Sequence, residues 1–235
     1  MKNIKKFLLI MAMTMALGTS AFAASGFEFI LNVPLGAGIT IVPKDYKGSG
    51  FKGTAGFDAG VEVQLGYMFQ VVNGFGVSAL VELGYAHDHF GFSVEEYDDA
   101  GNYTTPKLSY DLDSFKIGLL PKFNIGAFAI GIGGGVKVPL GGKMTYKLDD
   151  YKASDKLEMG FASSMFTPPV IGYVKATFDY SVFFTDNLAF NIGLYLGGDI
   201  AKFDLTRDAN NNDKPAGISN FDVGVELGLK FGPKA

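Results

Sequence analysis

The chain lacks cysteine and tryptophan entirely among its 235 residues. Without cysteine, disulfide-bonded scaffolds, thiolate zinc sites and cysteine nucleophiles are excluded. Basic residues are also outnumbered, since 20 Lys and Arg stand against 24 Asp and Glu and give a net charge of −4. An acidic chain of this kind does not offer the basic surface that nucleic acid requires, so we expect no nucleic-acid partner.

Long apolar runs are scarce as well. The longest, Phe7 to Leu17, has 11 residues, which is too short to cross a bilayer as a helix. Three lysines precede it and Ala21-Phe22-Ala23 follows it, which is the pattern of a cleavable signal peptide. We therefore expect residues 1–23 to be removed on export and residues 24–235 to form one domain. No later stretch reaches the ~18 apolar residues that a membrane helix needs.

The pattern that does fill the chain is alternation with period two, which indicates strands with two different faces. Eight apolar faces alternate in this way, at 27–41, 57–71, 75–89, 115–123, 128–140, 174–184, 188–200 and 221–231. Leu108, Tyr110 and Leu112 have the opposite parity to Phe115 onward, so a β-bulge is expected where they extend the fourth strand.

The connections between these segments alternate in length. Short ones lie near Asn73-Gly74, Asn124 and Asp186, whereas those at 42–56, 90–107, 148–169 and 204–218 are long and polar. Short turns on one side and long loops on the other are typical of outer-membrane barrels. We therefore predict an all-β fold, a membrane-spanning antiparallel up-and-down barrel of eight strands, with both termini on the periplasmic, short-turn side.

The two faces differ sharply in charge. The eight apolar faces comprise 55 positions without a single Asp, Glu, Lys or Arg, whereas the opposite faces carry fourteen charged residues and as many glycines. A Lys or Arg facing lipid at mid-depth costs about 2–4 kcal/mol, so complete exclusion indicates the lipid-facing side. The alternative is a soluble barrel of the lipocalin kind with its apolar face inward.

Aromatic residues cluster where strands meet the short turns. Such clustering predicts a girdle at the periplasmic interface of the membrane, formed by Phe27, Phe69, Phe75, Phe123, Phe128, Phe184 and Phe190.

The last predicted strand ends with the stretch from Gly224 to Phe231 and is followed by four further residues. With these alternating strands and long loops, the chain resembles the small eight-stranded outer-membrane proteins of the OmpX, OmpW and OmpA-barrel group. The resemblance implies a location in the cell outer membrane. It also implies that the barrel-assembly machinery recognises the C-terminal strand, through a signal that comprises Gly224, Leu227, Leu229 and Phe231.

We expect the candidate functional site on the inward faces of the strands, where the charged residues lie. Buried charges must be paired, so we expect a salt-bridge network across the lumen formed by Glu62, Glu82, Lys116, Lys137, Lys175, Asp179 and Glu226. Glu28 and Lys230, near the lower ends of the first and last strands, are expected to pair across the closure. An eight-stranded lumen is narrow enough for side chains to fill.

Sequence motifs for catalysis, phosphate binding or metal binding are weak. The glycine run at 131–135 lies inside a predicted strand without the Lys-Ser/Thr of a phosphate loop, and Asp208 to Asp213 lacks the Gly and Glu of a calcium loop. We therefore expect neither a cofactor nor a metal. His87 and His89 invite comparison with lipid-modifying outer-membrane enzymes, but no Ser adjoins them.

The function expected from these observations is non-enzymatic. A surface barrel with a filled lumen would act through its long loops, which face an extracellular ligand or a host surface, while its wall contacts outer-membrane lipid. Two alternatives stay open: a narrow OmpW-like conduit for small or apolar solutes, and a lipid-modifying enzyme at the outer rim.

Overall fold

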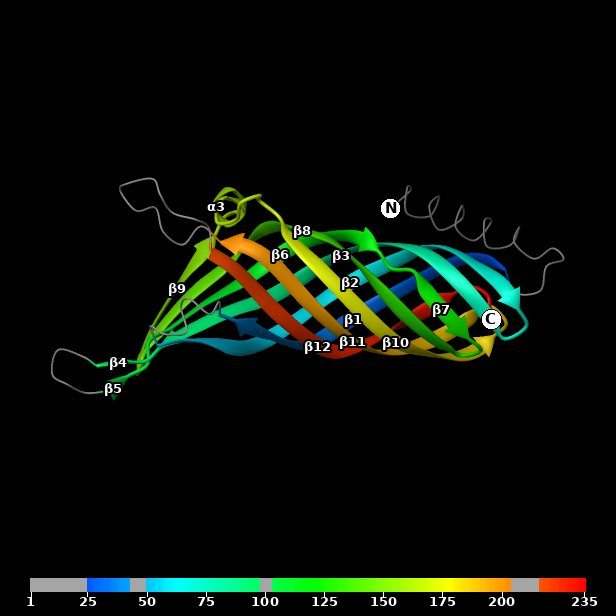
Figure 1. Ribbon diagram of the computed structural model, residues 1–235, viewed down its shortest axis with the longest axis horizontal. Helices are drawn as coiled ribbons and strands as arrows, with labels where there is room; N and C mark the ends of the chain where they lie inside the picture. Colours follow the sequence, from blue (N-terminus) through cyan, green and yellow to red (C-terminus); the bar gives the residue numbers. More distant parts are fainter. Residues whose placement is uncertain (1–24, 43–49, 98–102, 204–215) are drawn as a thin grey trace, which may run out of the picture.

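Eight antiparallel strands form a closed ring in the computed structural model, which describes residues 25–42, 50–97, 103–203 and 216–235 (Figure 1). The predicted signal peptide, the 208–213 motif and most of the 204–218 connection lie outside the described residues. In ring order the strands are β1 (Gly26–Ile41), β2 (Phe51–Val72), β3 (Phe75–Val94), β6 (Lys107–Leu119) with its continuation β7 (Lys122–Ile125), β8 (Phe128–Leu148), β10 (Ile171–Thr185), β11 (Leu188–Phe203) and β12 (Ala216–Phe231).

Two long-range pairings close the ring. β12 pairs with β1 from Phe29↔Phe231 to Ile41↔Ser219, and β8 pairs with β10 from Tyr180↔Phe128 to Ile171↔Lys137. No helix among the described residues is long and apolar enough to cross a membrane. A closed ring pairs the backbone groups of every strand, which is what a bilayer demands of a sheet. The predicted fold class is confirmed.

The short turns gather at one end of the barrel, which we call the short-turn end. β2–β3, β7–β8 and β10–β11 are each joined by two residues there. The first described residue, Ser25, accepts a 2.8 Å hydrogen bond from the Gln70 backbone amide, and the Gly232 amide donates to the Asn187 carbonyl. Both ends of the described barrel therefore lie at the short-turn end.

At the other end, several strands continue past the ring (Figure 1). β8 pairs with β10 only as far as Lys137 and then runs on with β6 and with β9 (Tyr151–Leu157). The upper parts of β2, β3, β6 and β8, together with β9, thus form a protruding sheet that we call the extension (residues 51–54, 87–94, 107–113 and 141–157). The hairpin β4 (Glu96–Tyr97) and β5 (Tyr103–Thr104) and helix α3 (Met159–Ser164) lie at this end as well.

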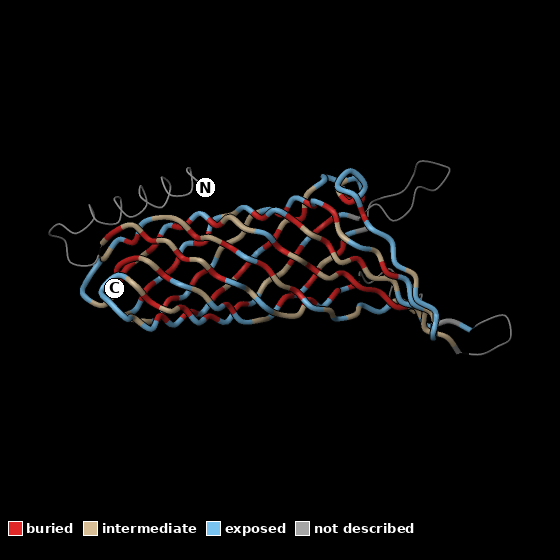
Figure 2. Tube along the Cα trace, turned by 180° about the vertical axis from the view of Figure 1, so that it is seen from behind, coloured by how far each residue is buried: buried red, intermediate tan, exposed pale blue. Residues whose placement is uncertain are grey.

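Side-chain burial alternates along every strand of the ring (Figure 2). Outward residues such as Val81, Ile117 and Leu194 are exposed, whereas inward residues such as Glu82 and Glu226 are buried. This is the arrangement of a membrane barrel, because a soluble barrel would bury its apolar face. The lipocalin alternative is therefore wrong.

In the extension, the outward face of the sheet becomes polar and the inward face becomes apolar. On β3 the outward residues Leu83 and Tyr85 give way to His87 and His89, while the inward series changes from Asp88 to Phe90 and Phe92. β6 changes in the same way, from outward Phe115 to Asp113 and from inward Lys116 to Leu112. The change from apolar to polar outward residues occurs at the same height on β3 and β6, since Tyr85 pairs with Phe115 and His87 with Asp113.

The expected bulge on the fourth strand is wrong. Leu108, Tyr110 and Leu112 extend β6 in unbroken register with β3, and they have opposite parity to Phe115 because they face inward. The register shift instead lies in the β6–β8 ladder, where Ser114 and Asp113 face Pro139 and Gly141. The extra residue, Leu140, belongs to β8.

The connections at 42–56, 90–107 and 148–169 are also more ordered than the sequence indicated. They contain the start of β2, the end of β3, the β4–β5 hairpin, β9 and α3. Their alternation was missed because its apolar phase is inverted above the ring.

Candidate functional site: the filled lumen

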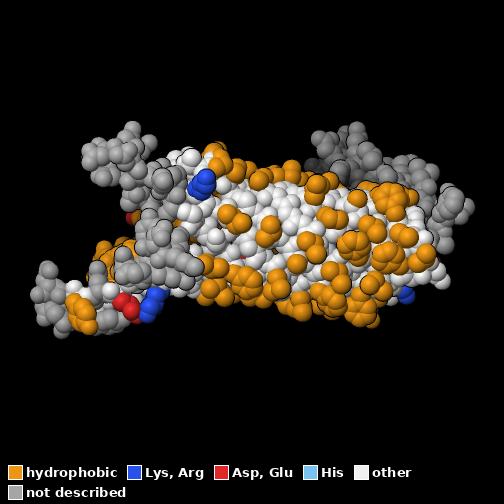
Figure 3. Space-filling view, in the orientation of Figure 1, with side chains coloured by type: hydrophobic (Ala, Val, Ile, Leu, Met, Phe, Trp, Pro, Cys, Tyr) orange, Lys and Arg blue, Asp and Glu red, His pale blue; other side chains and the backbone are white. Residues whose placement is uncertain are grey.

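The outer wall defines the setting of the site. Apolar side chains cover the visible face of the barrel, and charged ones appear only towards its ends (Figure 3). The structure places the aromatic girdle on this outer surface at the short-turn end, with ring contacts such as Phe128–Tyr180 at 4.8 Å between centroids. A charge-free apolar band with aromatic residues at its edge is the surface that a bilayer selects.

A central network of five charges spans the lumen. Lys116 lies 2.9 Å from Glu62 and 2.8 Å from Glu82, while Lys175 forms ion pairs with Glu62, Glu82 and Glu226. These residues come from β2, β3, β6, β10 and β12, so the network ties five of the eight strands together. All five are buried, with Glu62 only 1% exposed.

Neutral side chains complete this network. The Tyr173 hydroxyl donates to Glu82 at 2.9 Å, and its ring lies 4.6 Å from the Lys116 ammonium. Gln64 and Asn32 donate to Glu82 and Glu226. Such additional hydrogen bonds are what makes a buried ion pair tolerable in a low-dielectric interior.

Two smaller ion pairs lie nearer the short-turn end. Lys230 pairs with Glu28 at 2.6 Å across the β1–β12 closure, as the sequence predicted. Asp179 lies 2.8 Å from Lys122 on β7. Asp179 therefore pairs with a lysine that the sequence reasoning left out of the network.

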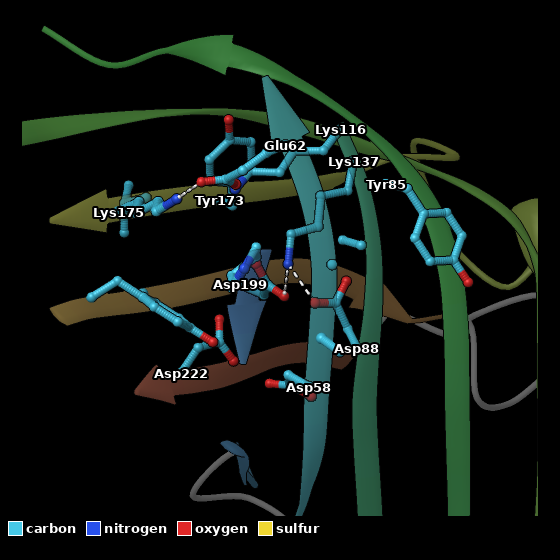
Figure 4. Close-up of a pocket in the computed structure, with 17 residues that line it drawn as sticks. Asp58, Glu62, Tyr85, Asp88, Lys116, Lys137, Tyr173, Lys175, Asp199 and Asp222 are labelled. Carbon is cyan, nitrogen blue, oxygen red and sulfur yellow. Dashed lines mark hydrogen bonds and ion pairs between the residues drawn. The ribbon is translucent and has the colours of Figure 1, made fainter. Parts of the chain in front are cut away.

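Four aspartates, Asp58, Asp88, Asp199 and Asp222, lie around one lysine at the upper level of the lumen (Figure 4). Lys137 binds Asp88 at 2.8 Å and Asp199 at 2.7 Å. Lys137 thus belongs to this upper cluster, not to the central network that the sequence predicted. Asn220 donates to Asp222, and Asp58 accepts the His89 amide. One oxygen each of Asp58, Asp88 and Asp199 has no hydrogen-bond partner among the described atoms.

A cavity of about 50 Å³ remains between the central network and the aspartates. A single water needs about 10–15 Å³ by this measure, so the space holds a few waters and no larger solute. In the described part of the chain, no group of three or more Asp, Glu or His side chains is arranged to hold a metal ion.

Above the charges, the lumen is closed by an apolar core. Leu112 and Ile171 are fully buried there, and burial raises the pKa of the Tyr110 hydroxyl. Helix α3 and the segment after it cover the core where β8 leaves β10, with Ser163 donating to the Pro139 carbonyl. The core comprises Val42, Phe90, Phe92, Tyr110, Leu112, Leu157, Ala162, Met165, Phe166, Ile171, Ala201 and Ile218.

The two histidines lie outside the lumen, on the outer face above the apolar band. His87 Nδ1 is 2.7 Å from Asp113 and His89 Nδ1 is 2.6 Å from Asp111. Asp113 also accepts the Tyr85 hydroxyl at 2.5 Å. Among the described residues, neither imidazole is hydrogen-bonded to a Ser or Thr hydroxyl, so no nucleophile–base pair is formed.

Sequence reasoning missed Lys122, Tyr173 and the upper aspartates as members of the site. Their signal was present, because strand parity already pointed them inward. Parity does not give their height along the lumen, however, and the height decides which charges meet.

Neither a protein-family model nor a curated protein matches the chain. Solved structures that resemble it include three outer-membrane proteins. Neisserial surface protein A is 10% identical, with 85% of this chain and 96% of that chain covered and a TM-score of 0.36. The attachment invasion locus protein Ail of Yersinia pestis is 12% identical, with 87% of this chain and 99% of that chain covered and a TM-score of 0.35. OprG of Pseudomonas aeruginosa is 14% identical, with 91% of this chain and 99% of that chain covered and a TM-score of 0.32.

The fold is established by the strand pairing of this chain itself. Eight strands close into a ring, the outer band is apolar, and the charges face the lumen. These features together make the chain a small β-barrel of the outer membrane.

Proposed function

We propose that this barrel is a non-enzymatic surface protein that does not conduct and that works through its extension and long loops. The observation that carries the proposal is the double closure of the lumen. The central network fills it at membrane level, and the apolar core fills it above. Because the lumen is filled at two levels, the surface that a partner can reach lies at the two ends of the barrel. The end that carries the extension is larger than the short-turn end.

A conduit for solutes is disfavoured by the same geometry. The Lys175 side chain reaches acids on β2, β3 and β12, so the network crosses the lumen. Ions entering from either side would have to break these pairs or cross the apolar core, and a cavity of about 50 Å³ lies between them.

A rim enzyme is disfavoured by the histidines. Each imidazole is engaged by an aspartate on the outer face, but an enzyme that cleaves or transfers acyl chains through a covalent intermediate also needs an activated nucleophile within about 3 Å of its base. Unchanged lipid A in cells that overexpress the protein is the expected result, and a modified acyl chain that depends on His87 or His89 would refute this part of the proposal.

Conductance tests the closed lumen directly. Purified full-length protein, refolded and inserted into planar bilayers, should give no steady single-channel steps, while a known porin in the same membrane should give them. Insertion is checked separately by the difference in gel mobility between boiled and unboiled samples. Steady steps that scale with salt concentration would overturn the proposal.

The absence of native cysteine allows the surface placement to be tested by labelling. Tyr151, at the exposed start of β9, and Asn73, in the first short turn, are replaced by cysteine in separate variants. A membrane-impermeant maleimide should label Y151C in intact cells, and N73C only after the outer membrane has been permeabilised. The reverse result would mean that the extension faces the periplasm.

A further inference from the structure

Five lysines lie on the outward face of the extension, on three adjacent strands. Lys107 of β6 pairs in register with Lys147 of β8, and Lys147 pairs in turn with Lys152 of β9. Lys143 of β8 pairs with Lys156 of β9. Register partners in an antiparallel ladder share a face, and Lys143 and Lys147 are an even number of residues apart. All five side chains are therefore on one face, and all five are exposed.

Between the two rows of lysines lies a row of hydroxyls. Thr145 of β8 pairs with Ser109 of β6 on one side and with Ser154 of β9 on the other. Thr145 and Ser154 are in hydrogen-bonding contact at 3.2 Å. The lysine patch thus comprises five exposed lysines and three hydroxyl side chains, of which Thr145 is buried at 8% exposure (Lys107, Ser109, Lys143, Thr145, Lys147, Lys152, Ser154 and Lys156).

The patch is poorly neutralised by the protein. Like charges directly opposite each other on a sheet repel, yet within the described residues none of the five lysines is within salt-bridge distance of an acid. Two acids of β6 share this face. Asp111 is across from Lys143 in register but is engaged by His89 at 2.6 Å, and Asp113 is engaged by His87 and Tyr85. Asp155 has the opposite parity to Lys156, and Asp149 and Asp150 lie in the turn. Such a surface is complementary to an anion from outside the chain.

The position of the patch identifies the anion. On β6 the outward series descends from Lys107 through Asp111 to Phe115, which belongs to the apolar band. At about 3.3 Å per residue, Asp111 and its partner Lys143 lie roughly 13 Å along the strand from Phe115, and Lys107 lies roughly 26 Å along it. With strands tilted by about 35–45°, the two lysine rows lie about 10 and 20 Å above the hydrocarbon. That is the layer of headgroups and sugars in the lipid that surrounds the barrel.

We propose that the lysine patch binds the phosphate groups of the glycolipid that forms the outer leaflet. Lysine ammonium groups and neighbouring hydroxyls are suitable donors for phosphate oxygens, and continuity with the lipid-facing band brings the headgroups of adjacent lipids alongside the patch. The inference rests on the proposed surface role, because it requires the extension to face outward. Its test does not involve conductance, so the two proposals fail separately.

The test is a titration of refolded full-length protein in neutral detergent with purified lipopolysaccharide, followed by thermophoresis. The same lipopolysaccharide stripped of its phosphates is the second probe. Binding of the phosphorylated form should be salt-sensitive, and the stripped form should bind at least tenfold more weakly. Each lysine near an anionic lipid surface is worth about 1 kcal/mol, or about fivefold in affinity. K143Q/K156Q should therefore weaken binding by about tenfold or more.

Two control variants isolate the patch. K202Q/K234Q removes the same charge from exposed lysines outside it and should bind as the unaltered protein does. Replacing all five patch lysines by arginine should keep the affinity within about threefold. Folding of each variant is checked by its heat-dependent gel mobility. Equal binding of both probes, equal loss in the two double variants, or binding of heparin but not of lipopolysaccharide would overturn the proposal.

Discussion

Strands β3, β6 and β8 run through two regions of the molecule in which the same faces have opposite chemistry. Within the ring, their outward side chains are apolar and their inward side chains form ion pairs, as Phe115 and Lys116 illustrate. In the extension, outward Asp111 binds His89 while inward Leu112 lies in an apolar core. The backbone is continuous between them, so the difference lies in what surrounds the barrel.

The comparison shows that the medium decides which face is apolar. Lipid accepts no charge, so the wall turns its charges inward and must pair them there. Water accepts charge, so the extension turns its polar residues outward and gains stability by burying aromatic and aliphatic side chains. The exchange between Tyr85 and His87 therefore marks the upper edge of the hydrocarbon.

The largest expected effect is in the ring. Replacing Lys175 by methionine leaves Glu62 and Glu82 with Lys116 and removes the lysine that pairs with Glu226. Breaking a buried ion network by removing one partner costs about 3–5 kcal/mol. Urea unfolding in lipid vesicles measures the change. Lys52→Met in the exposed pair with Glu95 is the control and should cost less than about 1 kcal/mol. Equal effects of the two variants would refute a buried network.

In the extension, the core should respond to lost volume. Leu112 is 0% exposed, and Leu→Ala at such a site costs about 2–5 kcal/mol. Because the ring has its own ion pairs, we expect Leu112→Ala to loosen the extension while the barrel stays closed. Limited proteolysis should cut the extension faster, with the heat-dependent gel shift preserved. A variant whose extension resists protease as before would show that the core does not hold it.

A single strand can locate the membrane edge. Val81 and His89 are both on the outward face of β3, and Val81 is 42% exposed. Val81→Lys should destabilise the barrel by about 2–4 kcal/mol in vesicles, because the lysine faces hydrocarbon. His89→Lys should change the unfolding free energy by less than about 1 kcal/mol, because the new ammonium group can pair with Asp111 above the hydrocarbon. Similar costs at both positions would mean that the boundary has been placed wrongly.

The smallest effect is expected among the upper aspartates. Asp58 is one of the four aspartates around Lys137 but forms no ion pair with it among the described residues. Its second carboxylate oxygen lacks a hydrogen-bond partner in the described structure. Asn in its place retains an acceptor for the His89 amide and removes one of the mutually repelling charges. We expect Asp58→Asn to leave the unfolding free energy unchanged or to raise it by about 1 kcal/mol. A loss of more than 2 kcal/mol would show that the Asp58 charge is required.

Much of the ring was predictable because its signals are local. Alternation with period two predicted the eight strands, and Asn73-Gly74 and Asp186-Asn187 predicted turns. The absence of charged residues on one face predicted that this face contacts lipid. The closure pair Glu28–Lys230 was predictable for the same reason, since both residues lie at the ends of strands that must meet. In the extension, inversion of the apolar phase made ordered strands resemble polar loops and suggested a bulge on the wrong strand.

The sequence by itself determined that this chain forms a barrel and which side chains face inward, because both follow from a period of two and from the exclusion of charge from lipid. Only the tertiary structure decided which charges meet. Lys175 reaches Glu62 and Glu226 from strands that are distant in the chain, and Lys137 joins the aspartates instead. Partners are set by register and strand tilt around the whole ring, and no local pattern records them.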